Sequence, residues 1–374
     1  MIFLDNASTT RVDKEVLDTY NKYCLEKFYN PSAPYRASLD VRNEIARAEK
    51  NIIESLCGDE KAKIIFTGSA TESNNMAILK NLNKRYKTVL MSIGEHSSIK
   101  NLENEIIMLG YNVEFVKLDE HGRVDIDDFK SKMSIDVGVV AIMHVSNETG
   151  AINDIEKLVK ISKQINPNCH FHCDGVQALC KIDVNLKKLG IDSYTFSGHK
   201  IFAPKGIAGL YVKDKIKPFI IGGGQQNNLR GGTENVPGIM ALEVAIKKGL
   251  LQKSFDYVQV LNNKAREILS TNKDIKINSD ENCSPYILSI SCLNVNGATL
   301  VNMLDDKGIC VGTGSACSSK KAGNETLLSM GLKTNEILGG LRLSFSKDNT
   351  MEEVQEACNE IILAYNKLKR ITMK

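Results

Sequence analysis

The sequence lacks several features that would place the protein at a membrane, on nucleic acid or outside the cell. No apolar run reaches about 18 residues, the length needed to span a bilayer. The net charge is only +3 and is spread along the chain without a basic tract, which argues against a nucleic-acid partner. The first residues, from Met1 to Asp5, have no basic region or cleavage site of a secretory signal. We therefore expect a soluble cytoplasmic protein.

The sequence also lacks a cysteine framework, internal repeats and low-complexity tracts. Its ten cysteines are irregularly spaced over 374 residues, which is typical of reduced thiols rather than of disulfides. A chain of this length with 42% hydrophobic residues can form two domains or one large α/β domain.

Short apolar runs alternate with helical patterns through most of the chain. After helices at 14–28 and 38–57, strands are predicted at 63–67, 88–91, 113–116, 137–142, 170–173, 194–196 and 207–212. Helices are predicted between most of them, at 72–83, 97–109, 125–131, 154–165 and 183–189. This alternation predicts an α/β fold with a mainly parallel seven-stranded sheet covered on both faces.

The pattern changes towards the C-terminus. One long helix is predicted at 236–270, followed by strands at 286–293, 308–311 and 341–345 and helices at 297–306 and 351–369. Thr350 and Glu353 have the spacing of a capping box before the last helix. We expect a large domain at 13–254 and a smaller α+β domain at 255–374, joined by residues 1–12, whose short strand begins at Leu4.

The segment from Ser193 to Lys200 holds the first candidate for chemistry. Its strand pattern breaks at Ser197-Gly198, which places Lys200 at the end of a buried strand. A partly desolvated lysine has a lowered pKa, and its neutral amine can attack a carbonyl. That is the requirement for a Schiff-base lysine of pyridoxal phosphate (PLP). A surface lysine in a turn is the alternative, so the hypothesis depends on the other motifs.

A second motif runs from Phe66 to Asn75 as a strand, a turn of small residues and the start of a helix. Free N–H groups and the helix dipole make such a turn an anion site, and Thr71 adds a hydroxyl. PLP needs a phosphate site of this kind at the sheet edge that carries its lysine. In open α/β sheets, ligands bind at the carboxyl ends of the strands.

The segment from Asn168 to Gln177 allows two interpretations. In the first, a non-enzymatic scaffold binds metal through cysteine and histidine ligands, namely Cys169, His170, His172, Cys173 and Cys180. Strand alternation weakens it, because Cys169 and Cys173 share a face with Phe171 and point away from the histidines. In the second, Asp174 ends the strand and keeps the pyridine nitrogen of PLP protonated. We favour the second and predict no metal.

Two further polar residues follow predicted strands of the same sheet. His96 comes after the strand at 88–91, where an imidazole can stack on a cofactor ring and move protons. Asn147 comes after the strand at 137–142. All these groups leave strands of one sheet, so we expect them to form a single site.

Ordered motifs across the chain resemble the PLP-dependent cysteine desulfurases of the nitrogen-fixation and iron–sulfur-assembly type, members of the class-V aminotransferases. These motifs are the segments 5–10, 70–74, 174–177, 197–200, 204–206, 230–235 and 314–317. The resemblance implies the PLP-dependent transferase fold type I and a homodimer with shared sites. One departure is Gly68-Ser69, where the family has the order Ser-Gly.

The resemblance also implies a role for each matching residue. Lys200 would bind PLP covalently and move protons, with His96 stacked on the ring, Asp174 at the pyridine nitrogen and Gln177 at the ring oxygen. Ala70, Thr71, Ser197 and His199 would surround the cofactor phosphate, which Thr233 would reach from the neighbouring subunit. Asn147 would contact cofactor and substrate, and Arg342 would bind the substrate carboxylate.

Cys317 differs from the other cysteines in its surroundings. It lies in a polar, glycine-flanked segment near Lys320 and Lys321, which can lower a thiol pKa. The resemblance makes it the sulfur acceptor, so L-cysteine would give L-alanine and a Cys317 persulfide. An acceptor protein such as an iron–sulfur scaffold would then take the sulfur, for clusters, thiamine or tRNA thiolation. A selenocysteine lyase or a small-amino-acid aminotransferase would share Lys200 and Asp174 without needing Cys317.

Overall fold

The computed structural model describes residues 1–313 and 325–372, and within them the chain forms two β-sheets. The larger sheet has the strand order β2-β8-β7-β6-β5-β3-β4. Its strands are β2 (Lys63–Thr67), β3 (Thr88–Ser92), β4 (Asn112–Val116), β5 (Val137–Met143), β6 (His170–Asp174), β7 (Ser193–Ser197) and β8 (Ala208–Val212). Neighbouring strands are parallel except where β8 pairs antiparallel with β2 and β7. The predicted mainly parallel seven-stranded sheet is confirmed.

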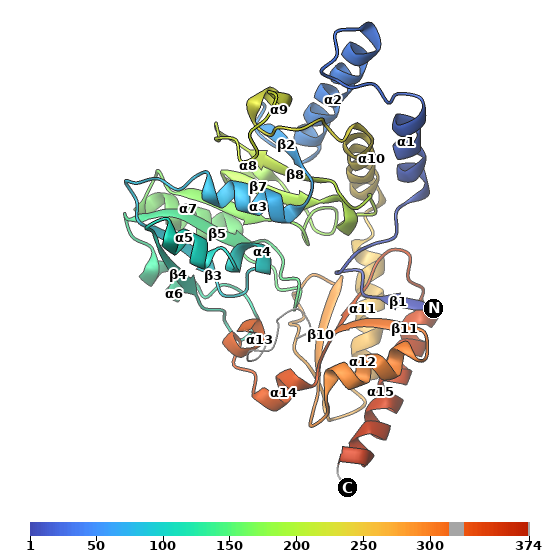
Figure 1. Cartoon of the computed structure of the whole chain (residues 1–374). Helices are drawn as coiled ribbons and strands as arrows, with labels where there is room; N and C mark the ends of the chain where they lie inside the picture. The colour runs from blue at the N-terminus through green and yellow to red at the C-terminus, as the bar shows by residue number, and fades with distance from the viewer. Residues whose placement is uncertain (314–324, 373–374) are drawn as a thin grey trace.

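Helices cover both faces of the larger sheet, as predicted (Figure 1). One face packs against α3 (Ala70–Leu79), α4 (Ser97–Lys100) and α5 (Glu103–Met108). The other packs against α1 (Lys14–Leu25), α2 (Arg36–Ser55), α6 (Ile126–Lys132), α7 (Ile155–Ile165), α8 (Leu186–Leu189) and α10 (Val236–Gln252). The short α9 (Gln225–Asn228) lies in the connection before α10.

The smaller sheet joins the two ends of the chain. Its order is β1-β11-β12-β10-β9, and β1 (Ile2–Leu4) pairs parallel with β11 (Ile309–Thr313). The remaining strands are β9 (Ile275–Ile277), β10 (Ile287–Cys292) and β12 (Gly340–Ser344). The helices of this part are α11 (Phe255–Leu269), α12 (Gly297–Asp305), α13 (Glu325–Ser329), α14 (Thr334–Leu338) and α15 (Met351–Thr372). Figure 1 shows β1, in blue, beside the orange C-terminal strands.

Three predicted elements differ from the structure, and the short elements α9, β9, α13 and α14 were not predicted. The long helix at 236–270 is two helices, because Lys253 has φ +40° and a left-handed residue cannot continue a right-handed helix. The helix at 97–109 is likewise divided, and Asn101 ends its first part. The N-terminal strand ends at Leu4 instead of beginning there, and Asp5 forms only an isolated bridge to Ser344.

Other predictions about the smaller part agree with the structure. The strands β10, β11 and β12 and the helices α12 and α15 lie where expected. The capping box is present, because Glu353 N donates to Thr350 Oγ1 and Thr350 N donates to Glu353 Oε2, each at a distance of 3.2 Å. The division of the chain at residue 254 stays a prediction. No helix within the described residues is long and apolar enough to cross a membrane.

Candidate active site

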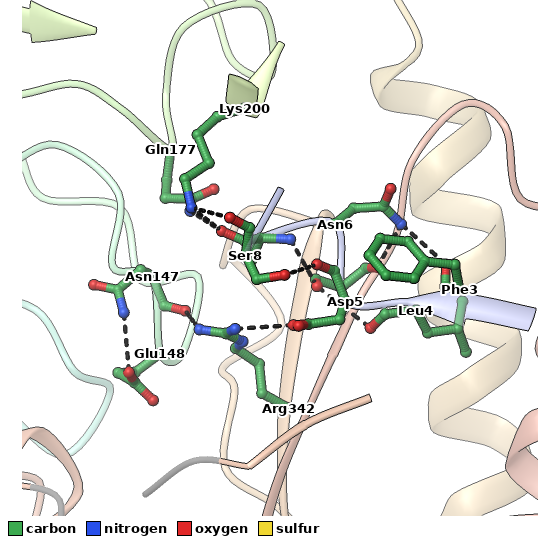
Figure 2. A network of polar contacts seen from close by, with 12 residues as sticks. Phe3, Leu4, Asp5, Asn6, Ser8, Asn147, Glu148, Gln177, Lys200 and Arg342 are labelled. Carbon is green, nitrogen blue, oxygen red and sulfur yellow. Dashed lines mark hydrogen bonds and ion pairs between the residues drawn. The ribbon is translucent and has the colours of Figure 1, made fainter. Parts of the chain in front are cut away.

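The candidate site lies at one edge of the larger sheet, where β2, β3, β5, β6 and β7 end; we call it the carboxyl edge. Lys200 follows β7 in a single 3₁₀ turn (Gly198–Lys200). Its Nζ donates hydrogen bonds to the carbonyl oxygens of Ala7 and Ser8, with a donor–acceptor distance of 2.6 Å in each case (Figure 2). Gln177 Nε2 donates to the same Ala7 oxygen over 2.9 Å. Two predicted site residues therefore meet on one N-terminal turn.

Asp174 ends β6 as a buried carboxylate at the same edge. Its Oδ2 accepts from Asn74 Nδ2 over 2.8 Å and its Oδ1 from Val176 N over 3.0 Å. Glycine is required at position 175, because a Cβ there would lie 1.9 Å from Cζ of Tyr194. The chain can thus turn directly after Asp174 and hold the carboxylate in place.

Asn74 is a further candidate for the site, although no role was predicted for it from the sequence. Its Nδ2 donates to Asp174, and its Oδ1 accepts from His172 Nε2 over 3.0 Å. His172 Nδ1 in turn accepts from Ser193 Oγ over 2.8 Å. Burial lowers the pKa of His172 to about 3, so the ring is neutral and fixes the orientation of the Asn74 amide. The one feature of the sequence that could have pointed to Asn74 is that it is a polar residue one turn into the helix that follows the predicted phosphate site.

His96 and Glu95 follow β3 at the carboxyl edge. His96 Nδ1 accepts from Ser98 N over 3.1 Å, which leaves Nε2 as the N–H of a neutral ring. Desolvation lowers the pKa of His96, and Lys200 and Lys100 lower it further against the opposite effect of Asp174. Burial raises the pKa of Glu95 to about 8, so this carboxyl is protonated at neutral pH. No role was predicted for Glu95 from the sequence.

The predicted phosphate site is the N-terminus of α3. Ser69 is the N-cap, and its Oγ accepts from Glu72 N over 3.2 Å, which explains the Gly68-Ser69 order of this chain. The N–H groups of Ala70 and Thr71 have no acceptor inside the helix. Glu72 would repel an anion there, but Arg230 Nε donates to its Oε1 over 2.9 Å and offsets its charge.

Three other residues predicted for the phosphate lie in different surroundings. Ser197 is buried at the end of β7. His199 faces Thr9, with 3.2 Å between Nδ1 and Oγ1, and desolvation together with Lys200 lowers its pKa to about 4. Thr233 is exposed, and no hydrogen bond within the described residues joins it to another predicted site residue.

Arg342 and Asn147, the residues predicted to bind substrate, are in direct contact. Arg342 lies on β12, and its Nη1 donates to the Asn147 carbonyl over 2.9 Å (Figure 2). Its Nη2 donates to Asp5 Oδ1 over 3.0 Å. Asn147 Nδ2 donates to Glu148 Oε1 over 2.9 Å. This guanidinium enters from the smaller sheet and reaches the carboxyl edge of the larger one.

The remaining candidates concern sulfur and metal. Cys317 lies outside the described residues. Cys169 and Cys173 belong to the hydrophobic core, whereas His170 and His172 both contact Ser193 Oγ on the opposite face of β6. No group of three His, Cys, Asp or Glu residues in the described parts of the chain is arranged to hold a metal ion.

Comparison with known proteins identifies the family. The family model for aminotransferase class V matches residues 2–356. The chain is 34% identical to cysteine desulfurase IscS of Dictyoglomus turgidum, over 99% of this chain and 96% of that one. It is also 34% identical to cysteine desulfurase IscS 1 of Archaeoglobus fulgidus, over 95% and 94% of the two chains.

A solved structure of a NifS-like protein superimposes with a TM-score of 0.91 at 31% identity, over 97% of this chain and 99% of that one. The matches in sequence and in structure cover nearly the whole chain, and the family model spans residues 2–356. The chain therefore belongs to the class-V aminotransferase family and, within it, to the cysteine desulfurases of the IscS and NifS type.

Proposed function

We propose that this protein is a PLP-dependent cysteine desulfurase that converts L-cysteine to L-alanine and transfers the sulfur through Cys317 to an acceptor protein. The observation that carries the proposal is the meeting of three groups from distant parts of the chain. The Lys200 amine, the buried Asp174 carboxylate and the Arg342 guanidinium gather around the carboxyl edge and the N-terminal turn. An acceptor such as an iron–sulfur scaffold, and a cytoplasmic location, are parts of the same proposal.

The residues at the carboxyl edge fit PLP. Asp174 is already fixed by two donors and suits a protonated pyridine nitrogen, and Gln177 suits the ring oxygen. His96 is neutral and can stack on a ring without adding charge. The phosphate would bind at the start of α3 through Ala70 and Thr71, with Ser197 and His199 beside it. PLP, when bound, supplies an electron sink for the electrons released at the substrate Cα.

The chain's own residues would carry out the remaining tasks. Lys200 would hold the cofactor and then, once released, take the Cα proton and later return protons. Arg342 would bind the substrate carboxylate, with Asn147 beside it, which fixes the orientation of the Cα–H bond. The Cys317 thiolate would attack the substrate sulfur, and the Cβ–S bond would break. The sulfur would stay on Cys317 as a persulfide, while the electron pair of the broken bond would go to Cβ, whose protonation would give the methyl group of L-alanine.

The test of this proposal is product analysis with the PLP-loaded protein. L-Cysteine is expected to give L-alanine in amounts that match the sulfur released to a thiol acceptor. L-Selenocysteine, supplied separately, tests the selenocysteine-lyase alternative. A preference for selenocysteine with no alanine formed from cysteine would favour that alternative, and amino-group transfer to a keto acid would favour an aminotransferase.

The Asn74–Asp174 contact gives a prediction about cofactor binding. Asn74→Asp places a second carboxylate where an amide now donates to Asp174, so the two acids share a proton and Asp174 loses negative charge. We expect PLP affinity to fall by about tenfold or more, which corresponds to roughly 1.4 kcal/mol. Titration of the apoprotein with PLP measures this.

The matched control for that prediction is Asn75→Asp on the same helix. Asn75 Nδ2 donates to the Ser98 carbonyl and does not contact Asp174. This variant adds the same charge one residue away and is expected to bind PLP nearly as tightly as the unmodified protein. Equal losses in both variants would mean that general charge, and not the Asp174 carboxylate, explains the effect.

We also propose a homodimer in which Thr233 completes the partner's phosphate site. Exposure of Thr233 and the lack of a described hydrogen bond to the other site residues support this arrangement. Thr233→Val is expected to weaken PLP binding several-fold without changing the sedimentation coefficient of the dimer. Sedimentation of the unmodified protein as a monomer with full PLP occupancy would contradict the prediction.

A further inference from the structure

The turn that follows β1 connects two candidate catalytic groups. Asp5 Oδ1 accepts from Arg342 Nη2 over 3.0 Å, and the two side chains are 22% and 12% exposed. This ion pair is thus partly shielded from water, so its geometry is better fixed than that of a surface pair. Residues 5–10 belong to the motifs that carry the family resemblance, and no role was predicted for Asp5 from the sequence.

The Asp5–Arg342 pair is seated against a glycine. Gly312 on β11 lies opposite Arg342 on β12 in the strand register. A Cβ at position 312 would lie 3.0 Å from Asp5 Oδ1 and 3.1 Å from Arg342 Nη2. It would also lie 3.2 Å from Arg342 Nε, a buried atom with no partner among the described residues. The pair therefore occupies space that any other residue at position 312 would fill.

Arg342 is held at two of its nitrogens by partners that leave donors for a ligand. Nη1 donates to the Asn147 carbonyl and Nη2 to Asp5. A guanidinium carries a further N–H on each of these nitrogens, in the planar geometry that suits a carboxylate. The Asn147 carbonyl carries no net charge, so Asp5 is the charged partner in this arrangement.

The other end of the turn holds Lys200. The carbonyls of Ala7 and Ser8 accept from Lys200 Nζ. Ser8 closes the turn on Asp5, because its N and Oγ donate to the Asp5 carbonyl over 3.0 and 2.7 Å. Asn6 Nδ2 fastens the turn to the Ser344 carbonyl on β12 over 2.9 Å. Figure 2 shows this chain of contacts from Arg342 through Asp5 and Ser8 to Lys200.

We propose that Asp5 is a positioning residue that orients the Arg342 guanidinium for the substrate carboxylate, on a turn that also holds the Lys200 amine. The inference rests on the proposed function, because it assumes that Arg342 binds that carboxylate. The turn sets the separation between the group that binds the carboxylate and the amine that exchanges with the substrate's amino group. Asp5 acts through Arg342 and does not itself touch substrate.

The test compares two ligands that differ only in the carboxylate. L-Alanine and ethylamine are titrated into the PLP-loaded protein, and the change in cofactor absorbance reports equilibrium binding. Asp5→Ala is expected to lower the binding affinity for L-alanine by about tenfold, because one charge-assisted hydrogen bond to Arg342 is lost. The affinity for ethylamine is expected to stay within about twofold of that of the unmodified protein. Asp5→Asn keeps an oxygen acceptor for Nη2 and is expected to stay within about threefold of the unmodified protein for both ligands.

A second variant removes no acceptor. Gly312→Ala pushes a methyl group against the ion pair. Like Asp5→Ala, it is expected to lower the affinity for L-alanine more than the affinity for ethylamine. Asp274→Ala is the control for loss of an ion pair, because it removes the pair between Asp274, just before β9, and Lys369 on α15, away from Arg342. Thermal unfolding of each apoprotein shows whether the variants are folded. The inference would be overturned if Asp5→Ala lowered the affinities for L-alanine and ethylamine equally. It would also be overturned if Asp5→Asn lowered the affinity for L-alanine as much as Asp5→Ala does.

Arg342→Gln separates failure of the inference from failure of the proposed function. If Arg342→Gln weakens the binding of L-alanine and Asp5→Ala does not, then Arg342 binds the carboxylate and only the proposed role of Asp5 is wrong. If Arg342→Gln leaves L-alanine binding unchanged, the carboxylate site is elsewhere and both the assigned role of Arg342 and the inference are wrong.

Discussion

Lys200→Ala is expected to abolish turnover and the visible absorption band of the lysine-bound cofactor. Among the groups at the carboxyl edge, Lys200 is the amine that the proposal places on PLP and uses to move the Cα proton. Loss of proton transfer alone typically costs 10²- to 10⁴-fold, so we expect turnover to fall by at least about 10³-fold. Absorbance spectra and alanine formation from L-cysteine measure both effects.

The control for Lys200→Ala is Lys205→Ala. Lys205 is an exposed lysine in the same connection between β7 and β8, and it has no assigned part in the site. Its variant is expected to keep the absorption band and the turnover. A Lys200→Ala protein that kept the visible band after dialysis, lost it on borohydride reduction and then retained the cofactor covalently would show that another amine carries the cofactor.

Cys317→Ser is expected to stop sulfur transfer but not substrate binding. Lys200, Asp174 and Arg342 are intact in this variant, so L-cysteine is expected to shift the cofactor spectrum as in the unmodified protein. A serine hydroxyl is far less nucleophilic than a thiolate near neutral pH, and alanine formation is expected to fall by at least about 10²-fold. Alanine formed at the unmodified rate would make Cys317 a bystander and favour a lyase that uses no protein thiol.

Cys24→Ser is the matched control for Cys317→Ser. Cys24 is exposed on α1 and has no assigned role. If both cysteine variants lost activity equally, oxidation or a general thiol effect would be the simpler explanation. Activity retained in Cys24→Ser and lost in Cys317→Ser would assign the sulfur step to position 317.

The larger sheet was predictable because most of its strands are buried on both faces. Every residue of β5 is buried, so this strand is a continuous apolar run, which its short length and its β-branched residues identify as a strand. The polar residues that end such runs, Asp174 after β6 and Ser197 after β7, could be placed at one edge because parallel strands end together. On this basis Lys200, Asp174, His96, Asn147 and Thr71 were predicted to share one site before any family resemblance was used.

The break at Lys253 could not be predicted from periodicity. The segments on both sides of it continue a helical pattern, and lysine carries no signal for the left-handed conformation that the structure assigns to it. The three residues of β9 are likewise too few to give a pattern. Such features depend on how the two parts of the chain pack, which local sequence does not record.

The hydrogen-bond partners of the site residues could not be predicted from the sequence either. Asp5 and Arg342 are 337 residues apart, and Asn74 and Asp174 are 100 apart, so no local pattern links them. The role of Arg342 came from the family resemblance alone, whereas its contacts with Asp5 and Asn147 required coordinates. Long-range polar contacts of this kind follow from the topology of the sheets.

The central claim is that sulfur passes from L-cysteine to Cys317, and mass spectrometry of the protein after brief exposure to L-cysteine tests it most directly. The account predicts one added sulfur atom on the peptide that contains Cys317, removed by a thiol reductant and accompanied by an equal amount of L-alanine. Alanine formed with no added sulfur on that peptide, or added sulfur on another cysteine alone, would contradict it.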